Sequence, residues 1–146
     1  MSNRRALVRA ISIIAVSILL WGCPERTSIW LDHSSTAQQP VFGLGRRRHH
    51  PELPLGSLPL LVVRRCDDDG ASGWRPAWQM EGADTNAPGP VPSLIPYGKA
   101  PGPRYITTLP AQQLSTGCYR AEIGGTGWVK FDIKPDGSIV EGQYGY

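Results

Sequence analysis

The chain lacks sustained helical periodicity after its first 22 residues. Its 17 glycines and 14 prolines interrupt nearly every window long enough for a helix. Apolar residues instead alternate with polar ones over short runs that end in turn residues, which is the pattern of strands. This absence excludes a helical domain, and the sequence predicts an all-β domain.

A hydrophobic run long enough to cross a membrane is also missing. The longest apolar run, residues 10–21, has 12 residues, whereas a spanning helix needs about 20. Arg4, Arg5 and Arg9 are the only charged residues before it. A basic start followed by a short apolar run is typical of a signal peptide, so residues 1–22 are predicted to be a helical signal peptide that targets the chain for export.

The end of this run, Leu20-Trp21-Gly22-Cys23, resembles the lipobox of bacterial lipoproteins. Leu20, Gly22 and Cys23 match that family's motif, whereas Trp21 departs from it, since the middle position is more often small or β-branched. The resemblance implies that Cys23 carries the lipid, including acyl chains such as palmitate, and becomes the first residue after cleavage. The alternative is an uncleaved helix in which Cys23 is an ordinary thiol.

If the resemblance holds, the protein is anchored by lipid to a membrane of the cell envelope. The destination is the periplasmic side of the outer or inner membrane, or the cell surface. Two or three acyl chains, each methylene adding about 0.8 kcal/mol, make such an anchor effectively permanent.

An excess of positive charge is lacking in the rest of the chain. Three of the 15 basic residues and none of the 12 acidic ones lie in residues 1–22, so 12 of each sign remain. Nucleic-acid binding is driven largely by Lys and Arg that neutralise phosphates. The balance therefore argues against a nucleic-acid partner.

Cysteine is scarce, with three in the whole chain. If Cys23 takes the lipid, Cys66 and Cys118 remain as a pair in an oxidising compartment, where they are expected to form a disulfide. The alternative is two buried thiols. Strict alternation places Cys118 on the outer face of its strand, so either the disulfide joins neighbouring strands at the surface or a bulge resets the phase.

The expected strands divide the exported part into a tether and a domain. Residues 23–40 form the lipidated N-terminus with a tether or first strand, and residues 41–146 form the β domain, with a Gly/Pro-rich loop around 82–103. Strands are predicted over residues 27–31, 41–44, 60–66, 76–80 and 104–108, with a short edge strand around 93–97.

The C-terminal third predicts a three-stranded antiparallel meander over residues 118–123, 128–134 and 138–141. Its inward residues are Tyr119, Ala121, Ile123, Val129, Phe131 and Ile133. With the other short strands, the meander predicts a small β-sandwich or partly open barrel, of the immunoglobulin-like or transthyretin-like kind.

Familiar catalytic motifs are absent: the sequence has no G-x-S-x-G, H-E-x-x-H or phosphate-binding glycine loop. We therefore expect no enzyme activity and no cofactor. Arg46, Arg47 and Arg48 offer an anion-binding group, and the alternative is a solvated loop.

Two further hypotheses concern a metal and a sugar. A metal-dependent envelope hydrolase would use histidines and aspartates that converge in one pocket, namely His33, His49, His50, Asp67, Asp68 and Asp69. Their spacing does not favour convergence, so no metal site is expected. A carbohydrate-binding module would need two or more surface tryptophans in a row, drawn from Trp30, Trp74, Trp78 and Trp128.

The function that the sequence favours is a non-enzymatic binding or assembly accessory domain of the cell envelope. Its expected partners are the membrane, through the lipid on Cys23, and another envelope protein.

Overall fold

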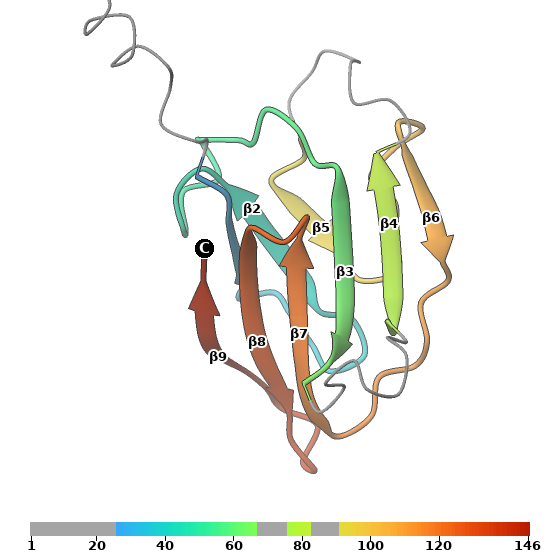
Figure 1. Ribbon diagram of the computed structural model, residues 1–146. Helices are drawn as coiled ribbons and strands as arrows, with labels where there is room; N and C mark the ends of the chain where they lie inside the picture. The colour runs from blue at the N-terminus through green and yellow to red at the C-terminus, as the bar shows by residue number, and fades with distance from the viewer. Residues whose placement is uncertain (1–25, 67–75, 83–90) are drawn as a thin grey trace, which may run out of the picture.

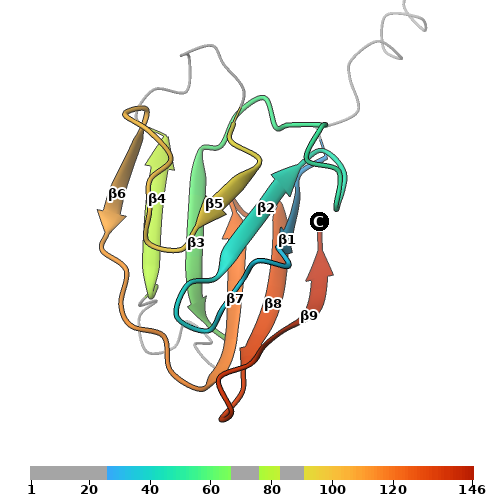
Figure 2. The same ribbon diagram turned by 180° about the vertical axis from the view of Figure 1, so that it is seen from behind.

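The computed structural model describes residues 26–66, 76–82 and 91–146. Over these residues the chain is all-β, with a three-stranded and a six-stranded sheet packed face to face as a small β-sandwich (Figures 1 and 2). In this part of the chain the two sheets remain separate layers and do not close into a barrel. The predicted fold class is confirmed.

No helix in the described ranges is long and apolar enough to span a membrane.

The small sheet contains β1 (Ser28–Leu31), β2 (Val41–Gly45) and β5 (Leu94–Pro96), in the order β1-β2-β5. All its pairings are antiparallel. The strand β5 is short and lies at an edge because Pro92 and Pro96 cannot donate to a ladder. It fulfils the prediction of an edge strand around residues 93–97, whereas residues 83–90 of the Gly/Pro-rich loop lie outside the described ranges.

The large sheet contains β3 (Leu60–Arg65), β4 (Trp78–Gly82), β6 (Tyr105–Leu109), β7 (Gly117–Ile123), β8 (Gly127–Ile133) and β9 (Ile139–Gly145). Its order is β6-β4-β3-β7-β8-β9, and every pairing is antiparallel. The strands β7, β8 and β9 form the predicted meander. Its alternation is confirmed, since all six residues expected to face inward are buried.

The last strand runs four residues beyond its predicted end at Glu141. Gly142 and Gly145 hide this extension in the sequence, because glycine weakens a strand pattern. Gly145 pairs with Trp128 of β8, and a side chain at Gly145 would overlap the indole of Trp128. The glycine is therefore what lets the tryptophan lie across the sheet edge.

The core lies between the two layers and is rich in aromatic rings. Phe42 of the small sheet meets Phe131 of the large sheet with ring centroids 5.8 Å apart, and Phe131 stacks on Tyr119 at 5.6 Å. Phe42, Trp78 and Phe131 are completely buried. These contacts fix how the small sheet sits over the centre of the large one.

The disulfide Cys66–Cys118 joins β3 to β7 within the large sheet, with 5.3 Å between the Cα atoms. The backbone N–H of Cys66 also donates to the carbonyl of Cys118 at 3.0 Å. The predicted pair is confirmed. It lies on the outer face between neighbouring strands, and the register of β3 with β7 runs without a bulge.

Candidate functional site

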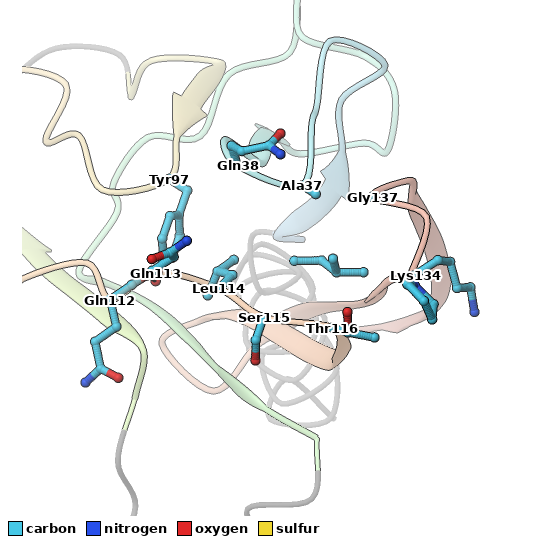
Figure 3. A pocket seen from close by; sticks show the side chains of 12 residues that line it. Ala37, Gln38, Tyr97, Gln112, Gln113, Leu114, Ser115, Thr116, Lys134 and Gly137 are labelled. Carbon is cyan, nitrogen blue, oxygen red and sulfur yellow. Dashed lines mark hydrogen bonds between the residues drawn. The ribbon is translucent and has the colours of Figure 1, made fainter.

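A pocket of about 610 Å³ opens at one end of the sandwich. Four segments line it: the turn after β1 with Ala37 and Gln38, Tyr97 after β5, the linker from β6 to β7, and the turn from β8 to β9 (Figure 3). Its volume lies in the range of small-ligand sites in proteins.

The strands β6 and β7 follow one another in the chain but are not neighbours in the sheet, so a linker must join them. Residues 110–116 connect an edge strand to a central one, with β4 and β3 between them in the sheet order. The linker therefore crosses the open end of the sandwich, where it forms one wall of the pocket. Pro110 starts it, and a proline there ends the ladder of β6 because it has no N–H to donate.

Tyr97 fixes the start of this linker. Its hydroxyl lies 3.0 Å from the carbonyl oxygen of Ala77 and 2.9 Å from that of Gln112, and shares its proton between them. The backbone N–H of Gln112 donates to the same Ala77 carbonyl at 2.9 Å. Burial raises the pKa of Tyr97 to about 12, so this anchor stays protonated at neutral pH.

Tyr119 fixes the end of the linker. Its hydroxyl accepts from the backbone N–H of Ser115 at 2.9 Å and donates to the carbonyl of the same residue at 3.0 Å. Gln113 and Leu114 lie between the two anchors. Neither residue makes a backbone hydrogen bond within the described part of the chain.

The floor of the pocket is apolar. Ala37 and Ile133 are buried, and Leu114 is partly buried against the core. Gln38 and Gln113 add side-chain amides that form no hydrogen bond among the described residues.

The described lining of the pocket is almost uncharged. Lys134 is the only charged side chain among the described lining residues, and its Nζ lies 3.4 Å from Oδ2 of Asp132 while the side chain points outward (Figure 3). No carboxylate, imidazole or thiol is found among those lining residues. The polar groups of the lining are instead side-chain amides and the hydroxyls of Tyr97, Ser115 and Thr116, which can form hydrogen bonds with a ligand.

The predicted anion-binding arginines do not share one environment. Arg48 turns into the fold, where it pairs with Glu141, donates to the carbonyl of Ile29 at 3.1 Å and lies 3.8 Å from the ring centre of Tyr144. Nε of Arg46 donates to the carbonyl of Pro54 at 3.2 Å, and Arg47 is exposed.

The three histidines also have different surroundings. The ring of His49 lies 5.5 Å from Trp30, and burial followed by the nearby Arg48 charge lowers the pKa of His49. His50 contacts Glu52 at 2.6 Å, whereas His33 is 96% exposed. Among the described residues, no three His, Cys, Asp or Glu side chains are grouped to hold a metal, and Asp67, Asp68 and Asp69 lie outside the described ranges.

The tryptophans form no exposed row on the described surface. Trp30 is 3% exposed and Trp78 is completely buried, while Trp74 lies outside the described residues. Trp128 faces outward as predicted, under the Arg120 guanidinium at 4.6 Å from its ring centre.

Sequence reasoning missed the pocket entirely. Gln38, Gln112, Gln113 and Leu114 belong to no motif, and the one local signal was a polar, proline-initiated stretch between two strands. The strand order that carries this stretch over the open end depends on long-range pairing.

No family model, curated protein or solved structure matches this chain.

Proposed function

We propose that this chain is a non-enzymatic binding domain of the bacterial cell envelope, anchored to a membrane by lipid on Cys23, with the pocket as its binding site. The observation that carries the proposal is the position of the pocket at the opposite end of the sandwich from the N-terminal entry. The lipobox resemblance, the disulfide and the almost uncharged pocket support the same function.

The distance between the N-terminal entry and the pocket can be estimated from the length of β8, which runs from one to the other. A side chain at Gly127 would overlap the carbonyl of Thr27, so the chain enters the sandwich beside the start of β8. Ile133, at the end of the same strand, lines the pocket. Because a strand rises about 3.3 Å per residue, the entry and the pocket are roughly 20 Å apart.

An anchor at Cys23 would leave only three residues before Thr27. Since an extended chain covers at most about 3.6 Å per residue, the domain would be held close to the bilayer. Its N-terminal end would then face the membrane, while the pocket would face a partner on the other side. A domain that presents an almost uncharged pocket in this way is suited to hold another envelope component.

The anchor is tested in cells with the full chain and with Cys23→Ser. The unchanged chain is expected to incorporate labelled fatty acid and to sediment with membranes, and the variant is expected to do neither. Label retained in Cys23→Ser would overturn the anchor.

The pocket is tested in the same anchored chain with a photo-crosslinking residue at Gln113. The matched control carries that residue at Gln143, an exposed glutamine on β9. A discrete adduct is expected at the pocket position and not at the control position. Equal crosslinking at both positions would overturn the pocket as the binding site.

A further inference from the structure

We infer that the pocket binds an extended, uncharged peptide segment, which pairs as an added strand with the linker backbone at Gln113 or Leu114 and places one aliphatic side chain on the apolar floor. This inference rests on the proposed function and names the ligand class of the same site.

The unpaired linker backbone is the first argument. Gln113 and Leu114 each offer a backbone N–H and a C=O without a partner in the described structure, and both residues line the pocket. The anchors at Gln112 and Ser115 hold this short segment in place on both sides. A fixed backbone with free hydrogen-bonding groups is what an extended peptide uses when it adds a strand.

The second argument is the chemistry around that backbone. Ala37, Leu114 and Ile133 provide an apolar floor for one aliphatic side chain. The amides of Gln38 and Gln113 can each donate and accept, which matches the peptide groups of a bound segment. Because Lys134 already pairs with Asp132, no free charge is offered to a charged side chain.

A neutral sugar is the alternative that the same amides would suit. Sugar sites usually present an exposed aromatic face, against which the ring stacks. Tyr97 is the aromatic residue among the described lining residues, but it is 7% exposed and its ring packs edge-on against Trp78 at 5.3 Å. The pocket therefore fits a peptide better than a glycan.

The test uses the full chain in detergent and a series of acetylated, amidated pentapeptides. Serine and threonine flank one central residue, which is alanine, valine, leucine, isoleucine or phenylalanine. Each peptide is also made as a set of singly methylated versions, in which the one N-methyl group lies on a different backbone nitrogen in each version. The affinity for the peptide is expected to fall about tenfold when alternate positions are methylated and to change little when the positions between them are methylated. The reason is that the hydrogen bonds of a strand pair recur at every second residue.

Three variants test the protein side of the pairing. Gln113→Pro and Leu114→Pro each remove one backbone N–H, while Gln113→Ala removes the side-chain amide and keeps the backbone. Successive N–H groups of an extended segment point to opposite edges, so one proline variant is expected to weaken peptide binding about tenfold and the other to weaken it little. Gln113→Ala is expected to bind within about threefold of the unchanged chain.

Hydrogen exchange covers the case in which a proline variant does not fold. In the unchanged chain, the amide proton of either Gln113 or Leu114 is expected to become protected when the peptide is added. Peptide binding without this protection, or without alternating sensitivity to methylation, would overturn the strand pairing.

A neutral oligosaccharide, cellopentaose, is the competing probe. Its binding in place of every peptide would overturn the peptide class and leave the proposed binding function intact. The inference would also be overturned if no pentapeptide binds at a peptide concentration of about 1 mM, at which even weak binding is detected. Fatty-acid labelling at Cys23 does not depend on any of these results, so a failure of the proposed lipid anchor is distinguished from a failure of peptide binding.

Discussion

Arg48 and Glu141, 93 positions apart in the sequence, form an ion pair at the seam between the two sheets. Arg48 also donates to the carbonyl of Ile29, and Glu141 accepts from the backbone N–H of Leu31 at 2.6 Å. The outer edge of β1 is thus satisfied by two side chains. The pair attaches the first strand to the last one.

Arg48→Ala is expected to lower the free energy of unfolding by about 1–3 kcal/mol, because it leaves the partly buried Glu141 without its cation. Denaturant unfolding measures this loss. Arg47→Ala, at an exposed neighbour, is the control and is expected to change stability by less than about 0.5 kcal/mol. Equal effects of the two substitutions would contradict a structural role for Arg48.

Gly43→Ala is expected to destabilise the small sheet by about 1–3 kcal/mol. Gly43 pairs with Trp30, and a Cβ atom there would overlap the buried indole. Gly142→Ala is the matched control in another strand, since its nearest new contact would be an ordinary 3.6 Å. Thermal unfolding compares the two, and a neutral Gly43→Ala would show that Trp30 does not pack across Gly43.

Phe131→Ala is expected to cost roughly 3–5 kcal/mol, because the ring is completely buried between Phe42 and Tyr119. The control is Val140→Ala on β9, where the side chain is 48% exposed. Denaturant midpoints are the measurement. A nearly neutral Phe131→Ala would be incompatible with the core as described.

Removing the disulfide by Cys66→Ala with Cys118→Ala is expected to cost roughly 2–4 kcal/mol. The bond closes a loop between residues separated by 52 positions, so its loss restores conformational freedom to the unfolded chain. Mass spectrometry of the unreduced protein is the accompanying check. Two free thiols there would contradict the pairing.

Alkaline stability tests the Tyr97 anchor. Its pKa is raised in the fold from the ordinary 10 to about 12, so folding favours the protonated phenol. This contribution to stability is complete below pH 10 and is lost as the pH rises from 10 to about 12. Tyr97→Phe is expected to reduce the slope of stability over this window.

The slope is expected to be reduced rather than abolished, because burial also raises the pKa of Tyr105. Tyr146→Phe, which removes the hydroxyl of a tyrosine that is 67% exposed, is the matched control. An unchanged slope in Tyr97→Phe would contradict the buried anchor.

Local patterns explain what could be predicted of the fold. The phase of Tyr119, Ala121 and Ile123 follows from period-two alternation between turns, which needs no knowledge of distant segments. The pairing of Cys66 with Cys118 followed from counting, since Cys23 had another expected role.

Long-range contacts explain what could not be predicted. The sequence places Arg48 in a basic loop, and only the structure shows that Glu141 lies beside it. Likewise, Gln113 and Leu114 become a site only because the sheet order carries their linker across the open end of the sandwich. Neither relationship leaves a periodic signal in the sequence.

The order of the large sheet also has a consequence for when the protein can fold. Four of its six strands, β6 to β9, lie after residue 104, and β3 cannot gain its second neighbour before β7 has been made. The first strand, β1, likewise lacks its large-sheet neighbours β7, β8 and β9 until these strands have been made. The large sheet therefore cannot be completed before β9 has been made, and this late completion would leave the chain unfolded during export if the proposed signal peptide operates.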